Sequence, residues 1–321
     1  MHAHMGLDEL GAFVATNPGP SEGPGAQRED QFNKRISDAM RPRQTDPVVR
    51  LKDMDEMGVD IQIVSVNLPP AAYWASAEKG LAISKICNDR VAEFCAHDPN
   101  RLVGIGVVPM QDAEVAGVEL QRCMTQLNLR GAIIASNIRA RDVGEAEFHP
   151  FWAKAATLGA PILIHPQGFS HPDRLAKFSL NNSIAQPLEE ALSMASLIYE
   201  GVMDANPDLK ICVCHGGGYL PYYTGRTDNA YRAQKSLQAI IPKPPSAYFD
   251  RFWYDTVVFD ALQLEYLVAR VGADKLMMGT DYPVPSADWH PIEFVKSAKR
   301  IGAADKTRIT GPNAARLFGI S

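Results

Sequence analysis

The sequence lacks the features of several protein classes. Its 321 residues include five cysteines, an odd number without Cys-x-x-Cys spacing, which argues against a disulfide framework and against a zinc site made of cysteines alone. No apolar stretch reaches the roughly 18 residues that a membrane-spanning helix needs, and the N-terminus lacks the pattern of a signal peptide. We therefore expect a cytoplasmic protein that does not act at membranes.

Basic tracts are also absent. The chain has 32 Lys and Arg residues against 37 Asp and Glu residues, a formal charge of −5 at pH 7. Proteins that bind nucleic acid need clustered positive charge to neutralise phosphates. The composition therefore argues against a nucleic-acid partner and favours a small-molecule ligand.

From residue 48 onward, short apolar runs alternate with longer amphipathic stretches. Each run is apolar almost throughout, which is typical of parallel strands covered on both faces. The predicted strands are Ile61–Val66, Leu102–Val108, Gly131–Ala135, Pro161–His165, Lys210–Cys214, Trp253–Val257 and Lys275–Gly279. The predicted helices between them are Ala75–His97, Ala113–Leu127, Phe148–Leu158, Pro187–Asn206, Tyr219–Gln238, Leu262–Val271 and Pro291–Ile301. This order predicts an α/β fold with a parallel sheet and outer helices.

An eighth strand would close such a sheet into a barrel. The candidate is the N-terminal stretch Met1–Met5, in which side chains alternate with a period of two. Almost no chain precedes this stretch, which leaves open whether the first strand begins upstream of Met1 or is a short stub. With it, residues 1–321 are predicted to form a single (β/α)8 TIM-barrel domain.

Residues 6–47 differ from the rest of the chain. They contain the turn-forming stretches Asn17–Pro20 and Gly23–Gly25 and show no sustained hydrophobic period. A long insertion after the first strand of a barrel lies at the C-terminal ends of the strands, where barrel enzymes have their active sites. We therefore predict that residues 6–47 form a loop or small cap over that end of the barrel.

Histidine and aspartate residues occur at the predicted C-terminal ends of several strands. His2 and His4 are one residue apart, so on a strand both imidazoles point from the same face. His165 ends an apolar run, His215 ends the next one, and Asp281 follows the last strand. Each of them alone could be a buried core histidine or a turn-capping aspartate. Their joint placement at strand ends indicates an active site instead.

Together these motifs resemble the amidohydrolase superfamily, and more narrowly its branch of decarboxylases typified by 2-amino-3-carboxymuconate-6-semialdehyde decarboxylase. The motifs are His2-x-His4, His165-Pro166, His215-Gly216-Gly217-Gly218, Gly279-Thr280-Asp281-Tyr282-Pro283 and the closing stretch Asn313–Gly319. Residues 49–59, 101–106 and 108–111 extend the resemblance, which runs from His2 to Phe318.

The resemblance implies that His2, His4, His165 and Asp281 bind one divalent metal ion. Three imidazoles and one carboxylate suit zinc best, with manganese as the second choice. The resemblance also implies that His215 is the general base or proton shuttle beside a metal-bound water, and Asp281 is assigned to catalysis as well as to metal binding. The predicted strand at residues 131–135 has no lysine that could be carbamylated to bridge two metals, which favours a single ion.

Four further residues are candidates for substrate binding. Arg226 matches a family position at which an arginine reaches the active site of the neighbouring subunit and binds the substrate carboxylate, which requires at least a homodimer. Phe178 lies near the family position of a tryptophan that stacks over the substrate. Trp74 is a candidate for the rim of the pocket, and His171 lies in the loop after the strand that ends at His165. Packing or solvent exposure would explain Trp74 and His171 equally well.

The three glycines after His215 allow two interpretations. A glycine-rich helix N-terminus offers backbone N–H groups to an anionic substrate. Alternatively, Gly216–Gly218 only form a sharp turn. The sequence does not decide between them.

These implications predict a metal-dependent, non-oxidative decarboxylase of a small unsaturated or aromatic carboxylic acid. The metal and a cationic side chain would hold the substrate, while His215 and the metal-bound water would protonate the carbon that loses CO₂. The same site would also suit a hydrolase that cleaves an amide, lactone or C–C bond. A third alternative is an inactive barrel with an incomplete first strand.

Overall fold

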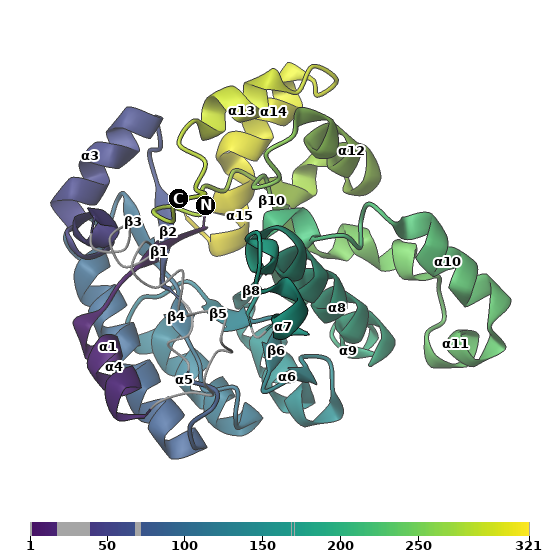
Figure 1. Cartoon of the computed structure of the whole chain (residues 1–321), viewed down its shortest axis with the longest axis horizontal. Helices are drawn as coiled ribbons and strands as arrows, with labels where there is room; N and C mark the ends of the chain where they lie inside the picture. The colour runs from purple at the N-terminus through teal and green to yellow at the C-terminus, as the bar shows by residue number, and fades with distance from the viewer. Residues whose placement is uncertain (1, 18–38, 68–71, 168, 170, 321) are drawn as a thin grey trace.

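The computed structural model describes residues 2–17, 39–67, 72–167, 169 and 171–320. In Figure 1 the helices surround a central group of strands. The parallel strands are β1 (His2–Met5), β2 (Gln62–Val66), β3 (Leu102–Gly104), β4 (Gly106–Val107), β5 (Ala132–Ala135), β8 (Pro161–His165), β9 (Lys210–Val213), β10 (Trp253–Asp255) and β11 (Leu276–Met277). A short antiparallel pair, β6 (Asn137–Ile138) and β7 (Arg141–Asp142), follows β5.

The parallel strands close into a barrel. They are hydrogen-bonded in the orders β1-β2-β3 and β4-β5-β8-β9-β10-β11. β3 and β4 are consecutive halves of one strand, separated by Ile105, whose N–H donates to the Val64 carbonyl at 2.9 Å. The other seam is closed by the residues after β11, because Ala3 pairs in parallel with Tyr282 and the His4 N–H donates to the Tyr282 carbonyl at 2.6 Å. The predicted (β/α)8 architecture is therefore confirmed.

The α-helices lie outside the strands. They are α1 (Asp8–Thr16), α3 (Pro47–Met57), α4 (Ala77–Cys95), α5 (Ala113–Gln126), α6 (His149–Leu158), α7 (Pro172–Leu175), α8 (Gln186–Tyr199), α9 (Val202–Ala205), α10 (Thr224–Ala233), α11 (Lys235–Ile240), α12 (Ala261–Val271), α13 (Pro291–Ser297), α14 (Ala303–Thr310) and α15 (Pro312–Phe318). Asp46, Asp112 and Asp260 each cap a helix by accepting hydrogen bonds from its first N–H groups. Among the described residues, no helix is both long enough and apolar enough to cross a bilayer.

The strand predictions agree with the structure to within two residues at each end. Two predicted helices are each divided in the structure. The pattern at Pro187–Asn206 is split into α8 and α9 at Gly201, which has a φ of +77°, a conformation that glycine adopts without strain. The pattern at Tyr219–Gln238 is split into α10 and α11, and the helix begins only at Thr224. Helices α10 and α11 project away from the barrel (Figure 1).

The segment predicted to be a loop or cap is partly helical. Residues 8–16 form α1, and residues 39–45 are also helical. The sequence pattern missed α1 because this helix is short and its apolar residues, among them Leu10 and Phe13, are only partly buried against the core. Residues 18–38, which hold most of the glycine and proline of the segment, lie outside the described residues.

A buried arginine of α3 fastens the short first strand. The Arg50 side chain is fully buried, and its guanidinium donates to the His4 carbonyl at 2.5 Å and to the Gln62 side-chain oxygen at 2.8 Å. The same guanidinium lies 4.8 Å from the centre of the Tyr282 ring. Arg50 therefore contacts β1, β2 and the residues after β11, which are the elements that meet where the barrel closes.

We predict that Arg50→Met lowers the free energy of unfolding by about 2–4 kcal/mol, because it leaves a buried carbonyl and a buried amide oxygen without their donor. Urea denaturation followed by circular dichroism measures this loss. The control is Arg90→Met, which removes exposed ion pairs with Glu9 and Glu93 and should cost less than about 1 kcal/mol. Equal losses in the two variants would contradict the structural role of Arg50.

Candidate functional site

Three histidines converge on one aspartate inside the C-terminal end of the barrel. The Nε2 atoms of His2 and His4 lie 3.2 and 3.0 Å from Asp281 Oδ1, and His165 Nε2 lies 3.8 Å from the same oxygen. All four side chains are buried or nearly so. The structure thus brings together the complete ligand set that the sequence predicted.

The barrel explains why these residues meet. On β1 the alternation of side chains points both His2 and His4 into the barrel, and His165 is the last residue of β8. Asp281 follows β11 in a left-handed conformation with a φ of +56°, which is uncommon for residues other than glycine. Its N–H donates to the His2 carbonyl at 3.2 Å, so the ligand backbones are bonded to each other.

Burial and mutual contact set the charges of these groups. Burial alone would lower the pKa of His2, but Asp255 and Asp281 outweigh it and raise that pKa. Burial raises the pKa of the Asp281 carboxyl, but the surrounding histidines outweigh it and hold that pKa well below the usual range. Burial lowers the pKa of His165 to about 3 and also lowers the pKa of His4. Asp281 is therefore an anion and both imidazoles are neutral, which are the forms that bind a metal ion.

The donor set fits a divalent cation. One ligand atom from each of His2, His4, His165 and Asp281 lies within 4.8 Å of all the others. Within the described part of the chain, neither ring nitrogen of the buried His165 has a hydrogen-bond partner. An unpartnered buried imidazole nitrogen is costly unless it coordinates an ion. Nitrogen and carboxylate donors in this combination suit zinc and related divalent metals.

A buried carboxylate orients the first histidine. Asp255, the last residue of β10, places Oδ2 at 2.7 Å from His2 Nδ1, and both side chains are fully buried. Its other oxygen accepts from the N–H groups of Gly216 and Val257 at 3.2 and 3.1 Å. Burial raises the Asp255 pKa, but His2 and His215 outweigh this effect and keep the carboxyl ionised. A carboxylate behind a metal-binding imidazole fixes the ring and strengthens it as a ligand.

His215 lies beside the four ligands. Its Nε2 is 3.6 Å from Asp281 Oδ2, and its ring centre is 5.3 Å from that of His165. Its Nδ1 lies 2.6 Å from Glu190 Oε1. Burial alone would lower the pKa of His215, but Glu190 and Asp281 raise it well above the ordinary value. The two carboxylates therefore favour the protonated form of His215, the form that can donate a proton.

The glycines after His215 form a packed turn, so the interpretation as an anion-binding helix N-terminus is wrong. The N–H groups of Gly216, Gly217 and Gly218 donate to Asp255, Cys214 and His215 respectively. All three have positive φ, and a Cβ on Gly218 would lie 2.0 Å from the Pro187 carbonyl oxygen. These positions need glycine for conformation and close packing.

The four predicted substrate contacts lie on the surface or rim. Arg226 is exposed on α10, away from the histidines, and His171 and Phe178 are exposed directly before and shortly after α7. Trp74 is partly buried. None of the hydrogen bonds, ion pairs or ring contacts of the described residues joins these four side chains to the histidine cluster.

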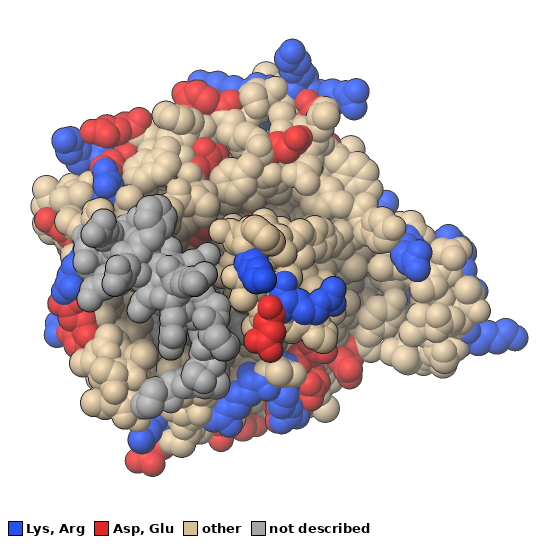
Figure 2. Space-filling model, in the orientation of Figure 1, with Lys and Arg blue, Asp and Glu red and all other residues tan. Residues whose placement is uncertain are grey.

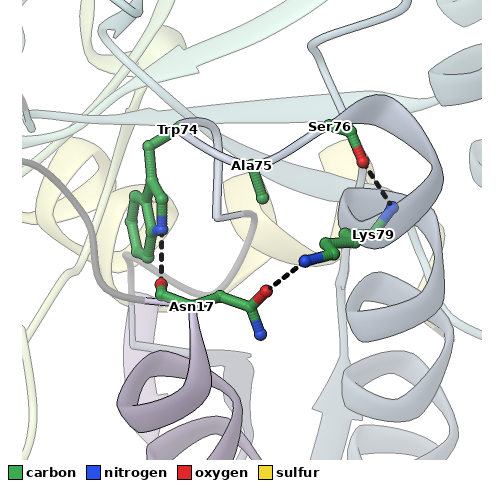
Figure 3. Close-up of a pocket in the computed structure, with 5 residues that line it drawn as sticks. All are labelled: Asn17, Trp74, Ala75, Ser76 and Lys79. Carbon is green, nitrogen blue, oxygen red and sulfur yellow. Dashed lines mark hydrogen bonds between the residues drawn. The ribbon is translucent and has the colours of Figure 1, made fainter.

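Trp74 lines a hollow beside α1 (Figure 3). Its indole N–H donates to the Asn17 carbonyl at 2.9 Å, and Lys79 Nζ donates to the Asn17 side-chain oxygen at 2.7 Å. Ala75 and Ser76 complete the lining of this hollow. In this structure Trp74 therefore anchors the end of α1 against the loop after β2.

Asp255 and Glu190 were not predicted from the sequence. Asp255 lies two residues before the end of the predicted strand Trp253–Val257. A carboxylate near the C-terminal end of a barrel strand is a signal that could have identified it. Glu190 lies within a helix, among ordinary helical residues, where no sequence pattern distinguishes it from a solvent-facing glutamate.

The chain is similar to known proteins over almost its whole length. The family model described as Amidohydrolase matches residues 1–320. A 2-amino-3-carboxymuconate-6-semialdehyde decarboxylase of Dictyostelium discoideum is 33% identical over 276 residues, which cover 86% of this chain and 77% of that protein.

Two solved structures are similar as well. The 5-carboxyvanillate decarboxylase of Sphingomonas paucimobilis superposes with a TM-score of 0.87 at 27% identity, covering 100% of this chain and 99% of that one. A dihydroxybenzoic acid decarboxylase of Polaromonas sp. JS666, solved with bound manganese and the inhibitor 2-nitroresorcinol, superposes with a TM-score of 0.83 at 26% identity, covering 99% and 95%. The family model, the sequence identity and the fold agree, and the chain belongs to the amidohydrolase family.

Proposed function

We propose that the protein is a metal-dependent, non-oxidative decarboxylase of a small aromatic or unsaturated carboxylic acid. The observation that carries the proposal is the convergence of His2, His4 and His165 on Asp281, with protonated His215 beside them. The relatives described above are decarboxylases of such acids. Hydrolysis at the same site, the alternative from the sequence, has no comparable support.

The reaction needs charge stabilisation and one proton. The bond between the carboxylate carbon and its neighbour breaks, CO₂ leaves, and the electron pair stays on the neighbouring carbon. A bound divalent ion would supply positive charge to the carboxylate or an adjacent oxygen of the substrate. His215 donates the proton from Nε2 to that carbon, and Glu190 at Nδ1 stabilises the imidazolium before the transfer. Solvent then returns the proton to His215.

We propose zinc as the metal because three imidazoles favour a borderline-soft ion. Manganese is the other candidate, since the Polaromonas relative was solved with it. The substrates tested first are 2,6-dihydroxybenzoate and 5-carboxyvanillate, which present a carboxylate beside a phenolic oxygen.

We also propose that the protein acts as a homodimer in which Arg226 binds the substrate carboxylate of the neighbouring subunit. Arg226 is exposed on the projecting helix α10, and among the described residues it forms no ion pair. Figure 2 shows Lys and Arg side chains around the tip of this projection. At its base, Tyr222, Leu262 and Tyr266 line an apolar hollow, and Leu262 is 65% exposed. An exposed apolar hollow beside a free cation suits an interface with a second copy.

The first prediction from the proposed function concerns the metal. Purified protein should contain about one divalent ion per chain, and His165→Ala should lose most of it because a site with three ligands binds more weakly. Elemental analysis after dialysis against zinc or manganese measures the content. The exposed His97→Ala is the matched control and should keep the metal. Unchanged content in His165→Ala would show that the ligand set is wrong.

The second prediction concerns the chemistry. The protein should release CO₂ from one of the acids above, and His215→Gln should lower kcat by at least about 100-fold because it removes the proton donor. The metal content of His215→Gln should stay unchanged. A trap for ¹⁴CO₂ from carboxyl-labelled acid measures the rate. Product formation without CO₂ would replace decarboxylation by hydrolysis.

The third prediction concerns the dimer. Arg226→Ala should keep its metal and raise KM, since the guanidinium binds the ground state as well as the transition state. Assayed well below its KM, a mixture with inactive His215→Gln should regain about one quarter of the wild-type kcat/KM, because half of the dimers are mixed and each has one intact site. Subunits are exchanged in mild urea before the assay. No recovery, or a monomer by light scattering, would contradict a shared site.

A further inference from the structure

We propose that Glu190 is a positioning residue that fixes the orientation and the tautomer of His215. It accepts a hydrogen bond from Nδ1–H and so directs Nε2 at the reacting carbon. This inference rests on the proposed function, in which His215 donates the proton, and adds a residue to it.

The geometry of the pair supports this role. Glu190 Oε1 and His215 Nδ1 are 2.6 Å apart, a short distance typical of a charge-assisted hydrogen bond. With Nδ1–H as the donor, the ionised carboxylate of Glu190 is the acceptor of this bond. The opposite ring nitrogen, Nε2, then points to Asp281 Oδ2 at 3.6 Å and lies beside the metal ligands. Glu190 thus determines which nitrogen of His215 faces the site.

The burial of Glu190 requires an explanation that packing does not give. The side chain is fully buried, and an unpaired buried carboxylate is strongly unfavourable. Its second oxygen, Oε2, has no hydrogen-bond partner among the described residues. Burial raises the pKa of Glu190 to about 7, opposed chiefly by His215. A leucine or glutamine would fill the same volume at less cost, so the carboxylate is explained by its bond to the imidazole.

The main chain of His215 is held in place, so only the orientation of its ring remains to be determined. His215 has a φ of +48°, and its carbonyl accepts from the Gly218 N–H at 3.2 Å, so its main chain is held in a tight turn. On the other side, Glu190 belongs to the second turn of α8, and its own carbonyl accepts from Ser193 Oγ at 2.9 Å. The bond between the two side chains therefore joins the turn after β9 to a rigid helix.

The tautomer of His215 tests the proposal without a substrate. In zinc-loaded protein labelled with ¹⁵N-histidine, long-range ¹H–¹⁵N correlation distinguishes protonated from unprotonated ring nitrogens, and His215→Gln assigns the signals. We expect Nδ1 of wild-type His215 to be protonated, with a hydrogen resonance far downfield. An unprotonated Nδ1 in the wild-type protein would overturn the proposal, whatever the kinetics of Glu190→Gln.

Kinetics of Glu190→Gln supply the second test. This variant keeps the side-chain volume and should lower kcat by about 10–100-fold, as is usual for groups that support a reacting imidazole, while metal content and KM stay near the wild-type values. The solvent deuterium isotope effect on kcat should rise, because proton transfer becomes slower. A purely structural role would lower the amount of folded protein without changing this isotope effect.

The matched control is Ser193→Ala. It removes a hydrogen bond within the same helical turn but leaves the carboxylate and His215 in place, so its kcat and isotope effect should equal those of the wild type. Equal kinetics in Glu190→Gln and Ser193→Ala would refute the proposal. If no acid releases CO₂, the proposed function fails, while the tautomer measurement still decides the role of Glu190.

Discussion

The site depends on the closure of the barrel between its first strand and the residues after its last one. The pairing of Ala3 with Tyr282, and the bonds between His2 and Asp281 and between His4 and Tyr282, join segments almost 280 residues apart. Two histidines from one end of the chain and the carboxylate from the other thereby come within hydrogen-bonding distance. Arg50 supports this seam from α3 by donating to the His4 carbonyl. A four-residue strand therefore gains from tertiary hydrogen bonds the stability that its length cannot provide.

Around the convergent ligands, the chain places charged groups in a second layer. Asp255 lies behind His2, and Glu190 lies behind His215. Buried carboxylates are unfavourable unless they are paired, and here each is paired with an imidazole that faces the centre of the site. Asp255 also accepts from the Gly216 N–H and so links the turn that carries His215 to the strand end beside His2. Asp255 thus contacts both His2 and the turn that carries His215.

The turn after His215 is part of the packing of the barrel. Its glycines are required by close packing, and their N–H groups are bonded within the protein, so they are not available to bind an anion. Arg226 is exposed on α10, which projects from the barrel (Figure 1).

The sequence by itself determined the strand order and identified the four side chains, His2, His4, His165 and Asp281, that the fold brings together. Apolar runs of strand length and histidines at their ends are local patterns, and period-2 alternation already places His2 and His4 on one face. Tertiary structure decided the remainder. Helix α1 is short and only half-buried, so its apolar pattern did not stand out in the sequence. Glu190 looks like any helical glutamate, and only the packing of α8 against the turn after β9 brings it to His215. The two interpretations of Gly216–Gly218 differed in where their N–H groups point, which depends on contacts with residues distant in the sequence.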